Sequence, residues 1–207
     1  MKNNQITVVF LLRNGRDAHQ NLEEFLFQLK NFPAGHPHEL LYLIKGFNEQ
    51  EVDKLVDKYE LDLNNIVEVP DKYFDLGSYF YATNTIKTEY GLFLNSHARP
   101  QVKDWLKLYH KSLELNDTSL VGATGSYEAN GFTVPFYTGT SLKDRVKWLQ
   151  RFLYRLLLSF LNFNNNVAFP NRHIRSNAFL TKISLYKRYI QKHGLPNSKR
   201  KCHLFES

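Results

Sequence analysis

Apolar residues in the first 125 positions fall into short continuous runs, separated by longer segments with helical spacing. The run at 6–12, Ile-Thr-Val-Val-Phe-Leu-Leu, is rich in β-branched residues and predicts a buried strand. Short apolar runs of this kind are typical of strands that are covered on both faces. By the same reasoning we expect strands at 39–44, 65–69, 90–94 and 120–123.

Amphipathic helices are predicted between these strands. Asn21 and Glu24 have the spacing of a capping box at the start of the first helix. Asn48 and Glu51 have the same spacing at the start of the second. Apolar residues then recur every three or four positions in two further segments. These helices are expected at 77–87 and around 102–109.

Strands that alternate with helices of this length favour an α/β domain with a mostly parallel sheet and right-handed crossovers. Ligands of such sheets bind beyond the carboxyl ends of the strands. The chain segments that follow the strands are therefore the ones that should carry the chemistry. They are 13–17, 45–47, 70–77, 95–100 and 124–130.

The pattern changes after Gly131. A loop rich in Gly, Thr and Pro leads to an apolar and basic helix expected at about 142–163. A strand is expected at 177–181 and a helix at 184–193, where Gly194 provides the C-cap. We therefore divide one domain into an α/β half, 1–130, and a basic segment, 131–207.

Charge is unevenly distributed along the chain. The net charge is +7, yet residues 151–207 hold eleven Lys/Arg and one acidic residue, a net charge of +10. The first 150 residues therefore sum to −3. A basic quarter on a nearly neutral body favours an anionic partner: a diphosphate, an anionic membrane surface or nucleic acid. Nucleic acid is the weakest of the three, because no known motif or basic–aromatic platform is present.

Cysteine content and the N-terminus suggest a cytoplasmic protein. Cys202 is the single cysteine, so neither an internal disulfide nor a cysteine metal cluster can form. The first residues lack the apolar stretch of a secretory signal, and no run of about 18 apolar residues exists that would span a membrane. We expect a cytoplasmic location, with peripheral membrane contact as an addition.

Two polar segments follow strands or open helices where a ligand would bind. In the first, 95–100, His97 suits a metal or a phosphate and Arg99 a phosphate, alongside Asn95. A simple helix-start loop is the alternative. In the second, Asp75 and Gly77 either cap and pack the third helix or hold a phosphate at its N-terminus.

The C-terminal quarter contains a dense group of hydrogen-bond donors. It comprises Arg172, His173, Arg175 and Asn177, which suit a diphosphate or the hydroxyls of a sugar. A solvated loop is the alternative. Glu206 is the single carboxylate of this quarter.

The helix at 142–163 combines a broad apolar surface with basic residues. Its apolar residues include Val146, Leu149 and Leu153, and Arg145, Lys147, Arg151 and Arg155 flank them. Such a composition suits a helix lying on an anionic membrane. A helix that covers the sheet or a subunit interface would have the same composition.

The order of these segments resembles the GT-A glycosyltransferases, especially family-2-like bacterial enzymes of surface-polysaccharide synthesis. The likeness rests on the first strand, on Phe-Asp-Leu-Gly-Ser-Tyr at 74–79, and on Tyr-Gly-Leu-Phe-Leu-Asn-Ser-His at 90–97. His-Ile-Arg-Ser-Asn-Ala-Phe-Leu at 173–180 resembles the acceptor side, and Leu-Phe-Glu-Ser at 204–207 the approach to the acidic catalytic motif. It implies a nucleotide-sugar donor, a saccharide or lipid-linked acceptor, and Glu206 as the base.

Two departures from the family pattern concern metal binding. The family's Asp-x-Asp metal motif is replaced by Asn-Ser-His at 95–97, and the second strand ends in Lys-Gly-Phe at 45–47 without acidic residues. Binding of Mn²⁺ or Mg²⁺ is therefore only weakly supported. The resemblance then implies that cationic side chains hold the diphosphate, with Arg99, His97, His173 and Arg175 as candidates. A non-catalytic sugar- or partner-binding protein of the same fold is the alternative.

Overall fold

The computed structural model describes residues 5–115, 118–126, 146, 149, 150, 153 and 173–195. The chain forms two compact units, of which the first comprises Met1–Thr124 and Ile174–Glu206, and the second Gly125–His173 with Ser207. Arg172, Cys202 and Glu206 lie outside the described residues, as does the side chain of His173.

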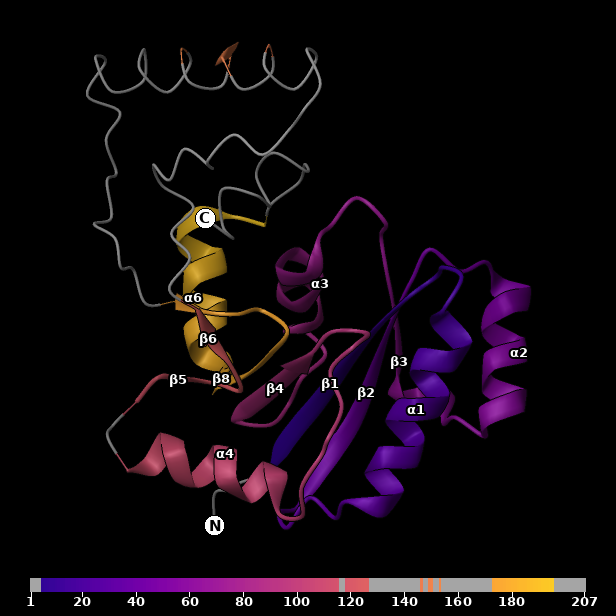
Figure 1. The fold of residues 1–207 in the computed structure, drawn as a ribbon, viewed down its shortest axis with the longest axis horizontal. Coiled ribbons are helices and arrows are strands. Elements are labelled where there is room, and N and C mark those ends of the chain that lie inside the picture. Colours follow the sequence, from indigo (N-terminus) through magenta and orange to yellow (C-terminus); the bar gives the residue numbers. More distant parts are fainter. Residues whose placement is uncertain are drawn as a thin grey trace. The chain divides into compact units, whose positions relative to one another are not determined.

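The first unit is built on a six-stranded sheet with the strand order β3-β2-β1-β4-β8-β5. Strands β3, β2, β1 and β4 are parallel to one another and lie side by side in Figure 1. This confirms the predicted α/β class with a mostly parallel sheet. The strands are β1 (Ile6–Arg13), β2 (His38–Lys45), β3 (Ile66–Val69), β4 (Tyr90–Leu94), β5 (Leu120–Gly122) and β8 (Ala178–Lys182).

The strand predicted at 177–181 has a place in the sheet that its sequence did not indicate. It forms β8, which pairs antiparallel with both β4 and β5 and separates them. Ring contacts across the β4 pairing, such as Phe93 with Phe179 at 5.4 Å between centroids, hold it there. The C-terminal part of the chain is thus integral to the sheet that the N-terminal half begins. A separate two-stranded sheet pairs β6 (Gly125–Ser126) with β7 (His173–Ile174).

Alternation along the central strands divides the core into two layers. Even-numbered residues of β1, such as Phe10, pack with the helices α1, α2 and α4, whereas Val9 and Leu11 pack with α3 and α6. Every residue of β1 except Arg13 is buried, because helices cover both faces of the sheet. The helices are α1 (Ala18–Asn31), α2 (Glu49–Tyr59), α3 (Asp75–Ala82), α4 (Trp105–Glu114) and α6 (Ile183–His193), with a 3-10 turn, η1 (Leu63–Asn65).

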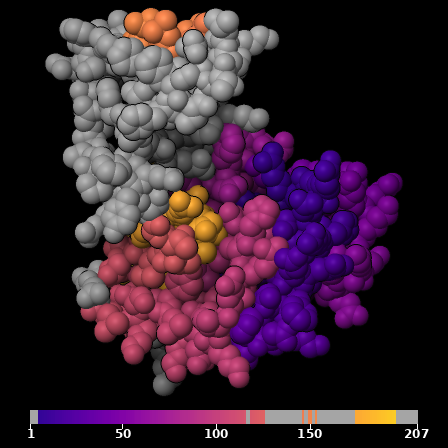
Figure 2. Space-filling view, in the orientation of Figure 1, coloured from indigo at the N-terminus to yellow at the C-terminus, as the bar shows by residue number. Residues whose placement is uncertain are grey.

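The start of α4 is fixed by the segment that follows α1. The Asp104 amide donates to the carbonyl of Pro33 at 2.8 Å, and the Leu106 amide donates to the carbonyl of Ala34 at 3.1 Å. In the space-filling view the residues of α4 (pink) lie directly against the N-terminal part of the chain (indigo) (Figure 2). The helix therefore begins at Trp105, after Val102 rather than at it, and the Val102 side chain is exposed.

Helix caps show which local signals the fold uses. Asn48 and Glu51 form the predicted capping box, and Gly194 is the C-cap of α6 with φ of 73°. The cap expected at Asn21 is wrong, because α1 begins at Ala18 and Asn21 is buried on its inner face. Asn21 instead bonds a distant arginine, described below.

The described residues of the second unit include three at helical spacing, Val146, Leu149 and Leu153. Their side chains are 52%, 50% and 56% exposed. Among the described residues no helix is long and apolar enough to cross a bilayer.

The stacked pair Phe10 and Phe25 offers a test of the core. Both side chains are fully buried and their ring centroids lie 3.9 Å apart. We expect Phe25→Ala to lower the free energy of unfolding by about 3–5 kcal/mol, because the cavity cannot close without moving α1 from the sheet. On the same helix, Phe27 is 63% exposed, and Phe27→Ala should change it by less than about 0.5 kcal/mol. Urea unfolding of both variants measures the difference, and equal losses would contradict this packing.

Candidate functional site

The strand order reverses at β1, which pairs with β2 on one side and with β4 on the other. Helical connections leave such a point in opposite directions and open a space at the carboxyl ends of the two strands. Here these ends are Arg13 on β1 and Leu94 on β4, with Asn95 next along the chain. We therefore built the candidate site outward from these residues.

Backbone and side-chain bonds hold the segment after β4 against its neighbours. The Ser96 hydroxyl donates to the carbonyl of Leu11 at 2.9 Å, which ties the segment to β1. The Asn95 amide donates to the carbonyl of Asn177 at 2.9 Å. The structure thus brings together Asn95 and Asn177, which the sequence placed in separate motifs. Thr124 is the third member, since its hydroxyl lies 3.2 Å from Asn177 Oδ1.

Arg99 is directed toward helix α1. Its Nη2 lies 2.6 Å from Glu24 Oε2 and donates to Asn21 Oδ1 at 2.8 Å, and its Nη1 donates to the carbonyl of His97 at 2.8 Å. The side chain is 19% exposed. These bonds fasten the segment after β4 to α1 and explain why Asn21 is buried. A role for Arg99 at a diphosphate stays a prediction, and these bonds occupy both terminal nitrogens of its guanidinium.

Asp75 lies at the start of α3 and is the most perturbed carboxyl of the described sequence. The interpretation of Asp75 as a helix cap is wrong, because Phe74 is the N-cap residue and no side chain bonds the first turn. Burial raises the pKa of Asp75 above its usual 3.8, while the positive charges of Lys45, Arg13 and His97 oppose that increase. The carboxyl is therefore surrounded by basic groups from the ends of three strands.

Lys45 and Arg13 are functional candidates that sequence reasoning missed. They are the last residues of β2 and β1, and the two positions are direct register partners. Odd-numbered neighbours Leu11 and Leu43 pack on the α3 side of the sheet, so Arg13 and Lys45 belong to the same face. Lys45 is 3% exposed. The available signal was their shared place at predicted strand ends, which a search for family motifs passed over.

Asn14 connects the ends of β1 and β2. Its amide donates to the carbonyl of Lys45 at 2.8 Å, and its side chain donates to the carbonyl of Gly46 at 2.9 Å and to Glu51 at 3.3 Å. Gly46 has φ of 76°, a conformation that favours glycine. An added Cβ at Gly46 would lie 3.9 Å from the carboxylate of Asp71, so Asp71 borders this turn.

The remaining predicted site residues are distributed as follows. Gly77 is buried in the first turn of α3, and both donors of the adjacent Ser78 bond the carbonyl of Phe74. The Arg175 amide donates to the carbonyl of Thr124 at 3.2 Å, close to Asn177, and its side chain is exposed. The backbone of His173 belongs to β7. The convergence of His173 and Glu206 on this edge stays a prediction.

The donor set at the end of β4 does not fit a hard divalent cation. Mn²⁺ and Mg²⁺ take carboxylate oxygens, whereas positions 95–97 offer an amide, a bonded hydroxyl and an imidazole. Among the described residues no group of three or more His, Cys, Asp or Glu could hold a metal ion. The reaction considered below is therefore written without a metal.

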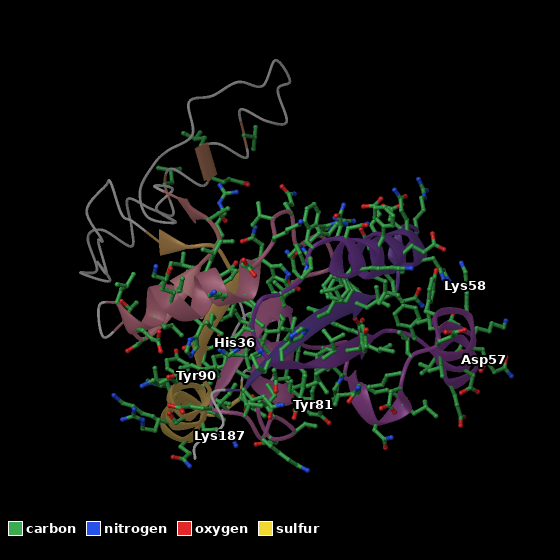
Figure 3. All side chains as sticks on the ribbon, turned by 90° about the horizontal axis from the view of Figure 1, so that it is seen from below. His36, Asp57, Lys58, Tyr81, Tyr90 and Lys187 are labelled. Carbon is green, nitrogen blue, oxygen red and sulfur yellow. The ribbon has the colours of Figure 1, made fainter. Side chains whose placement is uncertain are left out.

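Rings rather than basic groups gather at the opposite, amino edge of the sheet. His110 lies 4.5 Å from His36 and 5.5 Å from Tyr90 between ring centroids. His36 and Tyr90 lie at the same end of the molecule, away from Lys58 on α2 (Figure 3). His110 also lies 3.7 Å from Glu114. This packed group anchors α4 and leaves the carboxyl edge as the place for a ligand.

Comparison with known proteins identifies the fold. No protein-family model matches the sequence, and no curated protein matches it. Among solved structures, 4-diphosphocytidyl-2C-methyl-D-erythritol synthase from Anaerococcus prevotii is similar, with a TM-score of 0.52, 14% identity, and coverage of 98% of this chain and 82% of that one. CMP:2-keto-3-deoxy-manno-octonic acid synthetase, solved with CTP, has a TM-score of 0.52 at 8% identity, covering 90% and 78%.

A mannosyltransferase from Pyrobaculum calidifontis, solved with GDP-Man and Mn²⁺, has a TM-score of 0.52 at 13% identity. The match covers 89% of this chain and 46% of that one, so this chain spans about half of the mannosyltransferase's length. At such low identity these likenesses identify the fold alone. The fold is the GT-A-like α/β type of nucleotide-sugar and nucleotidyl transferases, as the sequence resemblance predicted.

Asp75 supplies a test of the site's electrostatics. Its folded-state pKa lies above its usual 3.8, so the folded protein binds this proton more readily than the unfolded chain does. Stability from this group is complete below about pH 4 and is lost as pH rises through the folded pKa. We expect Asp75→Asn to remove that loss, so that the variant gains stability relative to the natural protein over this interval.

Urea unfolding at a series of pH values measures this difference, and a carboxyl NMR titration of Asp75 gives the pKa directly. A variant that instead loses stability relative to the natural protein as pH rises would show that Lys45, Arg13 and His97 outweigh burial.

Proposed function

We propose that this protein transfers a sugar from a nucleoside-diphosphate donor to a saccharide or lipid-linked acceptor, as in surface-polysaccharide synthesis. The observation that carries the proposal is the gathering of Arg13, Lys45, Asp75 and His97 at the reversal point of a GT-A-like sheet. In sheets of this type that point is where ligands bind. Basic side chains there suit the phosphates of a nucleotide.

The proposed reaction inverts the configuration of the sugar. A base takes the proton of the acceptor hydroxyl, whose oxygen forms a new bond to the anomeric carbon of the donor sugar. The bond from that carbon to the diphosphate breaks, and the nucleoside diphosphate leaves with the electron pair. Positive charge beside the leaving oxygens lowers the barrier because negative charge develops there.

Glu206 is the proposed base, with Asp71 or Asp75 as substitutes in that role. Glu206 is the single carboxylate among the last 57 residues. The proposed donor- and acceptor-binding residues are Asp75, Gly77, Asn95, His97, Arg99, His173, Arg175 and Asn177. Support for grouping two of them comes from the bond between Asn95 and Asn177.

A second function has its own support. Positions 95–97 lack the carboxylate pair that the GT-A resemblance leads one to expect. A protein of this fold that binds a sugar or a partner enzyme without catalysis would have no need of that pair. Catalysis distinguishes the two functions, because both include binding of a sugar or nucleotide.

Transfer and binding assays with UDP-, GDP-, dTDP- and CMP-sugars test the enzyme proposal. We expect Glu206→Gln to reduce transfer by more than about a hundredfold while donor affinity changes little, since a base acts on the proton and not on the nucleotide. Glu114→Gln, an exposed carboxylate on α4, is the control and should retain full transfer. Donor binding without transfer by the natural protein would favour the non-catalytic function.

We also propose that the second unit attaches reversibly to anionic membranes. The half-exposed side chains of Val146, Leu149 and Leu153 and the nearby basic residues Arg151 and Arg155 support this contact. Apolar side chains would enter the lipid while arginines contact the headgroups. A subunit interface made by the same residues is the alternative outcome.

Co-sedimentation with vesicles tests membrane attachment. We expect the double substitution of Leu149→Ser and Leu153→Ser to weaken binding to anionic vesicles by more than about tenfold, because each leucine loses about 1.5–3 kcal/mol of burial. Leu63→Ser, at a side chain that is 62% exposed, should leave binding unchanged. Attraction to headgroups is screened by salt. Equal binding to neutral and anionic vesicles, unaffected by salt, would contradict this attachment.

A further inference from the structure

A nearly fully buried lysine stands at the ligand edge of the sheet. Lys45 is 3% exposed, although it is the last residue of its strand. Burying an ammonium group costs several kcal/mol unless an anion compensates. Its neighbours Leu43 and Val69 pack in an apolar layer. A longer apolar side chain would suit that layer better, so the position of Lys45 calls for a reason beyond packing.

A second permanent cation stands beside it. Arg13 is the register partner of Lys45 on the neighbouring strand, and paired strands lie about 4.8 Å apart. Both residues belong to the sheet face that α3 covers, where Asp75 is the carboxyl that both charges influence. One carboxylate neutralises one of these two cations at most. The edge therefore keeps a positive excess, to which His97 adds when protonated.

The other arginine near this edge is engaged elsewhere. Arg99 bonds Asn21, Glu24 and the carbonyl of His97, and its guanidinium is thereby fastened to α1. The cations available to a ligand on the α3 face are therefore Arg13 and Lys45. They stand on the side of the reversal point opposite to Asn95, so an anion between β1 and β4 would lie within reach of all three.

We propose that Lys45 and Arg13, together with His97, bind the diphosphate of the donor and take the place that a divalent cation would have. This inference rests on the proposed function for the identity of the donor. Lys45 supplies a compact charge from the strand end, and Arg13 supplies a fork of donors that fits phosphate oxygens. Asp75 is a positioning residue, because its carboxylate orients the two cations before the ligand arrives.

Isothermal titration with UDP, GDP, dTDP and CDP, in excess EDTA, tests the proposal. We expect at least one nucleoside diphosphate to bind, and Lys45→Met and Arg13→Gln each to weaken its binding by about tenfold or more. The corresponding nucleoside, which lacks phosphates, should bind all variants equally. Lys182→Met is the matched control, because Lys182 also ends a strand but pairs with Tyr90 at the amino edge. It should bind as the natural protein does.

Folding of the variants is checked by thermal unfolding. Replacing a buried charge by an apolar residue of similar volume is often neutral or stabilising, so Lys45→Met should unfold at the same temperature or higher. Arg13 is exposed, so Arg13→Gln tests the diphosphate site even if Lys45→Met fails to fold.

The outcomes separate this proposal from the proposed function. Diphosphate binding in EDTA that depends on Lys45 and Arg13, without any sugar transfer, supports the site and overturns the enzyme. Sugar transfer that requires Mn²⁺ or Mg²⁺ and is unaffected by both substitutions supports the enzyme and overturns the site. Absence of diphosphate binding in EDTA, or equal weakening by Lys182→Met, also overturns the site.

Discussion

Parallel pairing of β1 with β2 on one side and β4 on the other is the constraint on which the rest of the structure depends. It buries all of β1 except Arg13 and requires apolar side chains on both of its faces. It also fixes the place where the strand order reverses, and hence the edge at which a ligand can reach backbone and side chains together. Helices on both faces then follow, because each face is apolar and must be covered.

The composition of that edge is unusual in its charge. Lys45 and Arg13 stand beside a carboxyl, Asp75, whose pKa burial raises. Groups of this kind reduce the stability of a fold, because each loses hydration and the two cations repel each other. Arrangements that reduce stability persist most readily where a function needs them. The same reasoning does not extend to the amino edge, where His36, His110 and Tyr90 pack as rings.

Residue type alone misjudged two side chains near the edge. Arg99 has the chemistry of a phosphate ligand, yet its bonds fasten the segment after β4 to α1. Asn21 has the chemistry of a helix cap, yet it lies inside α1 and receives one of those bonds. Each error has the same origin, since an arginine and an asparagine far apart in sequence satisfy one another once the helix packs on the sheet. The competing explanation for each residue was local, and the contact is not.

The sequence by itself determined the α/β class, most strand positions, the capping box at Asn48 and the edge where a ligand would bind. These features follow from periodicity and local bonding, which a short stretch of chain encodes. Tertiary structure alone decided that β8 separates β4 from β5, and that Arg13, Lys45 and Asp75 meet. The reason is physical: register between strands sets which distant residues become neighbours, and burial sets the charge state that each can hold.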